Sequence, residues 1–592
     1  MISRRTLLQL ALISPIATAL HAAQRFGRNT LVNAPGSIVP ATDGVKLTRN
    51  WRGPVCESQL TNHGTRAVRI RSVVLFDLQL PLPASTRLYG EGFQMLSQTG
   101  GTLGQPADLG NYTDAKHYKM PTPDGARALY GMMMLTPSAT ENHLLAFTSC
   151  RRFAGQFYLA GQSLKVVVDT EDRELEPDET WQLESFTYES GANRERLLET
   201  LASQLVANHP PLRFPKPPTG WCSWYCFGPR VTSQQVLDNL DFIAKHTPGL
   251  RYVQIDDGYQ PAMGDWLETG AAFGGNVQGV LKQIRQRGFE PAIWVAPFVA
   301  EEKSNVFQQH PDWFVKDSDG KPLRSDRVTF GGWRRAPWYV LDGTHPQAQQ
   351  HVESFFRTMK REWGCTYFKL DANFWGAIHG GQFHDPRATR IEAYRRGMQA
   401  ILRGVEDSFV LGCNHPIWPS LGLIHGSRSS NDIKRTWERV ATTARQNLSR
   451  NWQNGRLWWN DSDAVVLTGE LSDNEFQFHA TAIYASGGMI LSGDDLTKIS
   501  EQKLAMLRKL QPPSGVAARF DDDSFRVGRI DLSNRRQVVS LLNWDDTPQT
   551  ISFRLARRSR ITDFWSDTSF GVHVNQFTAE MPARSGRLLI CD

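Results

Sequence analysis

Cysteine is scarce in this chain, with seven residues in 592. An odd and sparse set does not make a disulfide framework, and at least one thiol has to be free. Cys222 and Cys226 lie four residues apart, but no second pair of Cys or His residues has zinc-finger spacing. We therefore expect neither a disulfide-stabilised scaffold nor a structural zinc site.

An excess of charge of one sign is also lacking. The 66 Lys and Arg residues and the 60 Asp and Glu residues leave a net charge of +6, which is a weak field for this length. No tract rich in Lys or Arg stands out, so a nucleic-acid partner is not expected. Hydrophobic residues at 40% and charged residues at 21% are ordinary values, which exclude a disordered chain and a coiled coil.

Long hydrophobic runs are confined to the N-terminus. Residues 1–23 carry Arg4 and Arg5, then an apolar stretch over residues 7–20, then small residues typical of a cleavage site. The apolar stretch is shorter than the ~20 residues that a membrane span needs. Residues 3–8 resemble a twin-arginine export signal, and the alternative is an ordinary signal peptide with a chance Arg pair. We expect a periplasmic or secreted bacterial protein without a membrane anchor once the signal is removed.

The rest of the chain divides into parts with different patterning. Residues 24–207 show short alternating runs separated by Gly, Pro and Asn, which predicts an N-terminal β-sandwich domain. Residues 208–219 contain five prolines, and because proline favours extended backbone we expect a linker there. Residues 513–592 return to alternating strands, which predicts a small C-terminal antiparallel β-domain. The clearest strands of that domain are expected at 537–543, 549–555 and 587–591.

Residues 220–512 alternate short apolar runs with amphipathic helical stretches, which is typical of a parallel sheet built from β–α units. One helix is expected over residues 233–246, behind a capping box formed by Thr232 and Gln235. Eight units in roughly 290 residues predict a (β/α)8 TIM barrel. The alternative, an open doubly wound sheet, predicts a G-x-G-x-x-G turn after the first strand, and that motif is absent. The eight runs are 220–225, 252–256, 291–297, 367–371, 409–413, 423–427, 457–460 and 488–491.

Acidic and aromatic residues gather where the barrel runs end, which is where TIM barrels place their chemistry. A ring of carboxylates beside flat aromatic faces suits a neutral, hydroxyl-rich ligand such as a sugar. The structural alternative is that each Asp caps the helix after its strand. The polar residues are Asp256, Asp257, Lys369, Asp371, Arg428, Asp432, Asp461, Asp463, Asp494 and Asp495. The aromatic residues are Trp221, Trp224, Tyr259, Trp266, Trp294, Trp375 and Trp418, and the chain has 18 tryptophans in all.

Two carboxylates on opposite sides of an anomeric carbon are the minimum for glycoside cleavage. Asp371 lies two residues after Lys369, so both side chains are expected on the same face of the strand. The Lys369 ammonium is expected to hold Asp371 ionised, as a nucleophile requires. Asp432 follows a Ser-rich segment, and we expect a mobile loop there that suits a proton donor.

Seven segments occur together in a characteristic order. They are GWCSWY (220–225), QIDDGYQ (254–260), GFEPAIWVAPF (288–298), HPDW (310–313), YFKLDANFWGA (367–377), LGCNHPIWP…GSRSSND (411–432) and WWNDSDAV (458–465). This set resembles glycoside hydrolase family 36, which contains α-galactosidases (melibiases) and shares a clan with family 27. The resemblance covers about 290 residues, and the flanking β-domains fit the three-part layout of that family.

The resemblance implies a retaining double displacement that releases terminal α-galactosyl groups, without a metal or cofactor. Asp371 matches the nucleophile and Asp432 the general acid/base. The remaining matches are binding residues: Asp256 and Asp257 for the 4-OH and 6-OH, Lys369 for O3 and O4, and Arg428 and Cys413 for O2. Trp294 matches an aromatic residue beside the sugar, and Trp224 and Trp375 are expected to contribute to the same site.

Three segments depart from the usual family pattern. Residues 88–96 replace a Trp-Gln-Ser segment that reaches the sugar, so Phe93 or Gln94 either supplies that contact or belongs to the core. Asn414 and His415 are bulkier than usual and lie near C2, which leaves α-N-acetylgalactosaminidase as an alternative. His415 itself is expected to be structural or a subsite residue. Ala372-Asn373 is not the commonest continuation after the nucleophile.

Other functions remain as alternatives. An α-galactosyl transglycosidase would pass the sugar to another sugar instead of water. A metal-dependent barrel hydrolase predicts His-x-His at the first strand end, where this chain has Trp-Cys-Ser-Trp-Tyr. A non-catalytic sugar-binding protein would have lost Asp371 or Asp432, and both are present. Oligomeric state is not predicted.

Overall fold

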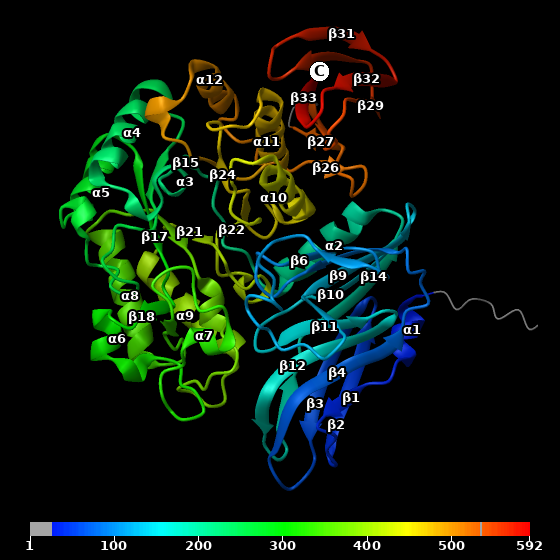
Figure 1. The fold of residues 1–592 in the computed structure, drawn as a ribbon. Helices are drawn as coiled ribbons and strands as arrows, with labels where there is room; N and C mark the ends of the chain where they lie inside the picture. The colour runs from blue at the N-terminus through cyan, green and yellow to red at the C-terminus, as the bar shows by residue number, and fades with distance from the viewer. Residues whose placement is uncertain (1–25, 533–535) are drawn as a thin grey trace, which may run out of the picture.

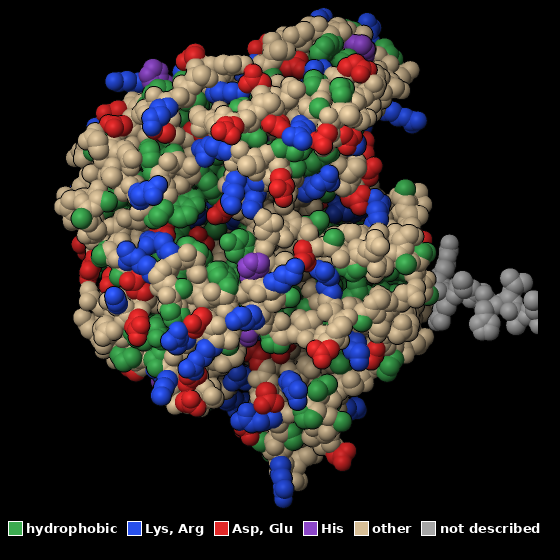
Figure 2. Space-filling model, viewed as in Figure 1, with side chains coloured by type: hydrophobic (Ala, Val, Ile, Leu, Met, Phe, Trp, Pro, Cys, Tyr) green, Lys and Arg blue, Asp and Glu red, His purple; other side chains and the backbone are tan. Residues whose placement is uncertain are grey.

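The computed structural model describes residues 26–532 and 536–592 (Figure 1). The expected signal segment, residues 1–23, lies outside the described residues. Within them, no helix combines the length and the hydropathy that a membrane crossing requires. Figure 2 shows acidic and basic side chains mixed over the visible face, with hydrophobic side chains in small groups. All seven cysteines are free thiols.

The N-terminal domain consists of two antiparallel sheets. One has the strand order β1-β4-β12-β11-β8, and the other has the order β13-β3-β14-β10-β9-β5-β6-β7 with β2 on β3. The strands are β1 (Ser37–Val39), β2 (Val45–Arg52), β3 (Val55–Asn62), β4 (Val68–Gln79), β5 (Arg87–Glu91), β6 (Gln98–Gly101), β7 (Pro106–Asp108), β8 (Arg127–Tyr130), β9 (Met132–Ser138), β10 (Glu141–Phe147), β11 (Ala154–Ala160), β12 (Ser163–Leu175), β13 (Thr180–Gln182) and β14 (Phe186–Gly191). A short helix, α1 (Arg28–Asn33), precedes them.

Aromatic side chains join the two sheets. Phe76 of β4 and Phe186 of β14 lie 5.2 Å apart between ring centroids, and Phe147 of β10 lies 5.6 Å from Phe157 of β11. All four are fully buried. Because alternate residues of a strand face the same side, each sheet offers one apolar face, and the two faces form the core of the domain.

The Pro-rich connector is packed against the central sheet. It follows α2 (Arg194–Asn208), a helix that the sequence pattern did not predict, whose leucines Leu198, Leu201 and Leu205 are buried. The Phe214 ring contacts Phe409 at 4.9 Å between centroids, and Trp459 donates its Nε1–H to the Phe214 carbonyl at 2.9 Å. These contacts hold the connector against the central domain.

The central domain is a curled sheet of parallel strands with helices around it, in the order β23-β22-β21-β20-β17-β16-β15-β25-β24. Each of the eight runs expected from the sequence overlaps a strand of this sheet. The strands are β15 (Thr219–Cys222), β16 (Tyr252–Ile255), β17 (Glu290–Val295), β20 (Tyr367–Leu370), β21 (Phe409–Gly412), β22 (Gly426–Arg428), β23 (Trp459–Asp461), β24 (Ala464–Val465) and β25 (Ile490–Ser492). A separate two-stranded antiparallel sheet of β18 (Val299–Glu301) and β19 (Trp338–Val340) is inserted after β17.

The helices of this domain bury apolar faces against the sheet. In α4 (Ser233–His246), Thr232 and Gln235 form the expected capping box, and Val236, Leu240 and Ile243 are buried. The others are α3 (Trp224–Phe227), α5 (Val277–Gln286), α6 (Asn305–Gln309), α7 (Ser325–Val328), α8 (Pro346–Arg361), α9 (Arg390–Val405), α10 (Trp437–Ser449), α11 (Asp473–Ser486) and α12 (Glu501–Lys509).

The C-terminal domain is antiparallel and packs on α10 and α11 (Figure 1). Its larger sheet has the order β26-β27-β28-β33-β30-β31, and β29 pairs with β32. Phe478 of α11 lies 4.9 Å from the Trp437 ring and 4.8 Å from the Trp544 ring, which anchors this domain. The strands are β26 (Arg519–Phe520), β27 (Val527–Asp531), β28 (Gln537–Asn543), β29 (Gln549–Arg554), β30 (Ser559–Asp563), β31 (Ser569–His573), β32 (Gln576–Met581) and β33 (Ser585–Cys591).

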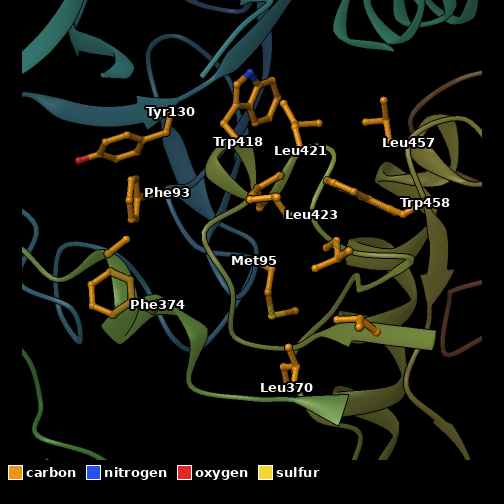
Figure 3. Packing of buried hydrophobic residues seen from close by; sticks show 14 of the residues in the cluster. Phe93, Met95, Tyr130, Leu370, Phe374, Trp418, Leu421, Leu423, Leu457 and Trp458 are labelled. Carbon is orange, nitrogen blue, oxygen red and sulfur yellow. The ribbon is translucent and has the colours of Figure 1, made fainter. Parts of the chain in front are cut away.

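The N-terminal domain lies directly over the carboxyl ends of the central strands. Figure 3 shows Phe93 and Tyr130 of the first domain beside Phe374 of the second, and Phe93 lies 6.0 Å from the Phe374 ring. Trp418 donates its Nε1–H to the Phe147 carbonyl at 2.8 Å. A mostly apolar contact of this kind fixes the two domains relative to each other.

A buried ion pair crosses the same interface. The Arg450 guanidinium donates from Nε and Nη2 to the Glu91 carboxylate, at 2.6 Å for the closest pair, and the two side chains are 1% and 0% exposed. Arg450 Nη1 also donates to the carbonyls of Met95 and Ser429 at 2.6 and 2.9 Å. One guanidinium thereby links the first domain to the loop that carries Asp432.

We predict that Arg450→Leu destabilises the protein by about 3–5 kcal/mol, because Glu91 is left buried without a cation. The measurement is urea unfolding followed by tryptophan fluorescence. Arg361→Leu is the matched control, since Arg361 pairs with Glu406 at the surface with its side chain 64% exposed, and its loss costs about 1 kcal/mol or less. Equal midpoints for the two variants would contradict this role of Arg450.

Candidate active site

A cavity of about 530 Å³ opens at the carboxyl ends of the central strands. Parallel strands of a β/α sheet place their terminal side chains at the same edge, so residues far apart in sequence meet there. Both the N-terminal and the central domain contribute to its wall. The lining residues are Leu96, Asn111, Tyr112, His117, Tyr118, Trp224, Asp256, Asp257, Trp294, Phe330, Trp333, Lys369, Asp371, Cys413, Asn414, Asn431, Asp432, Lys434 and Arg439.

Asp371 lies immediately after β20. Its backbone N–H donates to the Val295 carbonyl at 2.8 Å, and its carboxylate accepts from Ala372 N–H at 2.7 Å and from Trp294 Nε1–H at 3.1 Å. Burial raises the pKa of Asp371, while the Lys369 charge lowers it and the Asp432 charge raises it further. Lys369 thus acts on Asp371 in the expected direction, but desolvation outweighs its effect, so the pKa of Asp371 lies above its ordinary value.

Lys369 pairs with a different carboxylate. Its Nζ donates to Asp256 Oδ2 at 2.9 Å, and the two side chains are 5% and 2% exposed. Gln254 Nε2 donates to the same oxygen at 2.6 Å, and Asp257 N–H donates to Asp256 Oδ1 at 2.9 Å. Burial would lower the pKa of Lys369, but attraction by Asp256 and Cys222 raises it well above the usual value. Lys369 and Asp371 nevertheless line one cavity, as their spacing in the strand predicts.

Asp257 is held by an arginine that the sequence reasoning missed. Arg334 donates to Asp257 Oδ2 from Nε at 2.6 Å and to Oδ1 from Nη2, and Gln260 Nε2 donates to Oδ1 at 2.7 Å. Arg334 belongs to the loop of residues 329–337, which carries Gly331 and Gly332 with φ of 94° and 128°. A Cβ on Gly332 would lie 2.7 Å from the Trp338 ring, so only glycine fits there.

Asp432 is the exposed carboxylate of the cavity, with a side chain that is 55% exposed. Arg428 Nη1 donates to its Oδ1 at 2.9 Å, while the same guanidinium pairs with Asp461 at 3.1 Å and Asp463 at 3.0 Å. Arg428 is 3% exposed and lies behind Asp432 instead of lining the cavity. In this structure it positions the carboxylate, and its expected contact with O2 stays a prediction.

The segment before Asp432 is not the mobile loop that we expected. Ser429, Ser430 and Asn431 are almost fully buried. Ser429 Oγ donates to Asn447 Oδ1 at 2.6 Å, and Asn431 N–H donates to Gln446 Oε1 at 2.9 Å. Serine is common in exposed loops, but here its hydroxyls satisfy buried polar groups of α10, which holds the segment in one conformation.

Asp461 and Asp463 are structural supports behind the cavity. Asp463 accepts from Tyr225 Oη–H and from Ile433 N–H, both at 2.6 Å on Oδ2. Burial raises the pKa of Asp463 to about 6, with the Arg428 charge opposing that rise. Asp494 is likewise outside the cavity and pairs with Arg435 at 2.8 Å.

The predicted aromatic residues divide between the cavity and the core. Trp224 and Trp294 line the cavity, as does Cys413. Trp375 does not: it is fully buried and packs against the Trp338 ring at 4.9 Å. Trp266 supports Trp294 with its ring at 5.8 Å, and the remaining ones are in the interior. The tryptophan excess is thus only partly a property of the site.

The N-terminal domain reaches the cavity through Leu96 and residues 111–118, and not through Phe93 or Gln94, which are buried in the interface. Tyr118 donates its hydroxyl to Asn414 Oδ1 at 2.9 Å, and Asn414 has a left-handed backbone with φ of 43°. No local pattern marks residues 111–118, because their place in the site depends on how the two domains pack.

His415 is structural, as expected. It is fully buried, and its Nε2 and Nδ1 are hydrogen-bonded to Ser427 at 2.9 Å and Ser420 at 3.0 Å. Burial lowers its pKa to about 3, so it stays neutral.

Comparisons with known proteins agree with this geometry. Residues 242–407 match the family model described as Melibiase. A type blood alpha-D-galactosamine galactosaminidase from Flavonifractor plautii is 26% identical over 204 residues, which are 33% of this chain and 18% of that protein. The chain spans about a fifth of the length of the curated relatives it matches first.

Solved structures are similar over more of the chain. The alpha-galactosidase TtGalA from Thermus thermophilus is 22% identical with a TM-score of 0.63, covering 82% of this chain and 98% of that one. A variant of the family 36 alpha-galactosidase AgaA from Geobacillus stearothermophilus is 14% identical with a TM-score of 0.65, covering 93% and 82%. At these identities the likeness shows the fold. Together with the family match, it supports a glycoside hydrolase.

Proposed function

We propose that this chain is a retaining exo-glycosidase that hydrolyses terminal α-linked galactosyl groups of oligo- or polysaccharides. The observation that carries the proposal is one cavity with two carboxylates in different environments, Asp371 partly buried at a strand end and Asp432 exposed. The Asp432 charge acts on the pKa of Asp371, so the two groups are close enough to interact. The Melibiase match and the fold of α-galactosidases support the choice of sugar.

In the first step Asp371 attacks the anomeric carbon. A bond forms from its carboxylate oxygen to C1, the C1–O bond to the leaving group breaks, and Asp432 gives its proton to the departing oxygen. The Trp294 indole N–H and the Ala372 backbone N–H hold the Asp371 carboxylate in one orientation. A fixed nucleophile needs little reorganisation when it reacts.

In the second step Asp432 takes a proton from water, and the water oxygen displaces Asp371 from C1. Retention requires the two carboxyl groups to lie ~5–5.5 Å apart in the bound complex. Arg428 orients Asp432 through the hydrogen bond to Oδ1 and leaves Oδ2 for the proton transfer. Access of a second sugar in place of water would make the enzyme a transglycosidase.

The deep end of the cavity offers both donors and acceptors to the sugar. Asp256 and Asp257 supply carboxylate oxygens and Lys369 supplies N–H groups. Lys369 is paired with Asp256, and Arg334, which lies outside the lining, is paired with Asp257. A site built for the axial 4-OH of galactose leaves these groups unpaired when glucose binds, which rejects it. The relative named a galactosaminidase favours an α-N-acetylgalactosaminidase as the second candidate.

The proposal extends to the closure of the central sheet and to the location of the protein. We assign the chain to family 36 with a closed (β/α)8 barrel, because β23 and β24 occupy the two ends of the sheet order and are separated in sequence by only Ser462 and Asp463. Three residue steps span at most about 11 Å, so the sheet ends have to be close. Residues 1–23 would direct export by the twin-arginine route to the periplasm or beyond.

Replacing each carboxylate tests the roles directly. Asp371→Asn is expected to lower kcat by at least about three orders of magnitude on 4-nitrophenyl α-galactoside. Asp432→Ala is expected to lower kcat about 10²–10⁴-fold on melibiose and less on the activated aryl substrate, with rescue by azide. Asp407→Asn, at the opposite end of the barrel with its side chain 87% exposed, is the control that keeps activity. Activity retained in Asp371→Asn would overturn the assignment.

The ionisation of Asp371 predicts how activity depends on pH. Asp371 must be ionised to attack, so activity falls as the pH drops through its pKa, which burial raises. Lys369→Met removes the charge that lowers this pKa, so the acid limb of kcat/KM on the aryl substrate should move to higher pH. Lys360→Met, which loses a cation paired with surface Asp407, is the control and should leave the limb in place. A limb that stays fixed or moves to lower pH in Lys369→Met would show that Asp371 does not control it.

A further inference from the structure

The leaving-group side of the cavity can be located from Asp432, and this step rests on the proposed function. A general acid must lie within hydrogen-bond reach of the oxygen that it protonates. The group attached to that oxygen therefore lies beside Asp432 and its neighbours Asn431 and Lys434, which line the same cavity. Arg439, in the first turn of α10, lines it as well.

Lys434 and Arg439 differ from the other cations of the site, each of which is paired with an acid. Lys369 is paired with Asp256, Arg334 with Asp257, and Arg428 with Asp432. Across the described parts of the chain, no acidic group lies within 4.0 Å of the charged nitrogens of Lys434 or Arg439.

Arg435, the other basic residue of this stretch, does not face the cavity. Arg435 turns into the protein, where it donates to the Thr468 carbonyl at 2.9 Å and pairs with Asp494 at 2.8 Å. Only Lys434 and Arg439 of this segment present free positive charge to the cavity. Arg435 is therefore a structural cation, whereas Lys434 and Arg439 are available to bind a ligand.

Aromatic rings are exposed on the same cavity. Tyr112 is 39% exposed and Trp333 is 37% exposed, which is unusual for large rings, and both line the cavity. Tyr112 rests against His117 at 4.6 Å, and Trp333 rests against Trp338 at 4.6 Å between ring centroids. Supported, half-exposed rings offer flat faces to the C–H side of a sugar.

We infer that the leaving group is an anionic saccharide, carrying a carboxylate or a sulfate ester that Lys434 and Arg439 bind while the sugar ring contacts Tyr112 or Trp333. The deep end is unsuited to an anion, because Lys369 and Arg334 are already paired with Asp256 and Asp257 and the carboxylate of Asp371 adds negative charge. An anionic substituent is therefore favoured only on the side of the leaving group. Its attraction to two unpaired cations strengthens as salt is lowered.

The test is a comparison of matched disaccharides. The first pair is α-galactosyl-(1→4)-galacturonate against α-galactosyl-(1→4)-galactose, and the second is the 6-sulfated form of the latter against the unsulfated one. The quantity is the ratio of kcat/KM within each pair. For the intact enzyme at low salt, we expect each cation that binds the anion to raise this ratio about fivefold. That factor is the upper end of the range for a partly exposed ion pair. A larger ratio in one pair identifies carboxylate or sulfate as the group.

Variants distinguish direct binding of the anion by Lys434 and Arg439 from a general effect of the positive charge of the protein. The ratio should fall in Lys434→Gln and in Arg439→Gln, and should approach one in the double variant and in 0.5 M salt, where screening acts within about 4–5 Å. Lys216→Gln, in the Pro-rich connector at the opposite end of the strands, is the control and should keep the ratio.

Three outcomes would overturn the inference: a ratio of one or less in both pairs for the intact enzyme, a ratio unchanged in the double variant, or equal losses on neutral and anionic substrates. If one of these outcomes is found and the neutral disaccharide is still cleaved efficiently, the proposed function stands and only the inference of an anionic leaving group is wrong. Failure to cleave any member of either pair or the aryl α-galactoside would instead remove the proposed function.

Discussion

The site depends on one buried guanidinium. Arg428 ends β22 and lies among the carboxylates of Asp461, Asp463 and Asp432, at 2.9–3.1 Å. A cation this deeply buried is stable only when acids surround it, and acids so close together are stable only around a cation. The ring of charges therefore fixes the ends of β22 and β23 together. Asp432 is the one member of the ring that reaches the cavity, so its position follows from the pairing behind it.

A second arginine secures the same segment from the other domain. Arg450 pairs with Glu91 across the interface and donates to the Ser429 carbonyl, one residue from Arg428. The N-terminal domain is thus coupled to the segment that presents Asp432, the proposed general acid, and it also supplies Tyr112, His117 and Tyr118 to the cavity. Two carboxylates acquire different environments in this way: Asp371 is enclosed by Trp294 and Ala372, and Asp432 faces the opening.

Local sequence pattern predicted the elements well. The eight apolar runs of the central domain each overlap a strand, and the helix from Ser233 to His246 has the bounds and the capping box that its sequence indicates. Asp256, Asp257, Lys369, Asp371 and Asp432 meet in one cavity because parallel strands end at one edge. This prediction requires only that the strands be located in the sequence and that the residues at their carboxyl ends be identified.

The pattern could not predict what depends on packing between distant segments. Arg334 reaches Asp257 from an inserted loop, and Tyr118 reaches Asn414 from another domain. Trp375 was expected in the site but is buried behind it, since composition does not tell which side of a loop a ring occupies. Lys369 was expected to hold Asp371 ionised, yet its direct partner is Asp256. Asp256 follows β16, which is separated from β20 by β17, and a pairing across strands cannot be read from the sequence of one strand.

The central claim is that Asp371 forms a covalent bond to the sugar. Incubation with 5-fluoro-α-galactosyl fluoride, which forms the glycosyl-enzyme quickly and hydrolyses it slowly, followed by proteolysis and mass spectrometry of the peptides, tests it directly. The account predicts one fluorogalactosyl group on the peptide that contains Asp371. A label on a different carboxylate, or rapid turnover of the fluoride with inversion at C1 and no labelled peptide, would contradict it.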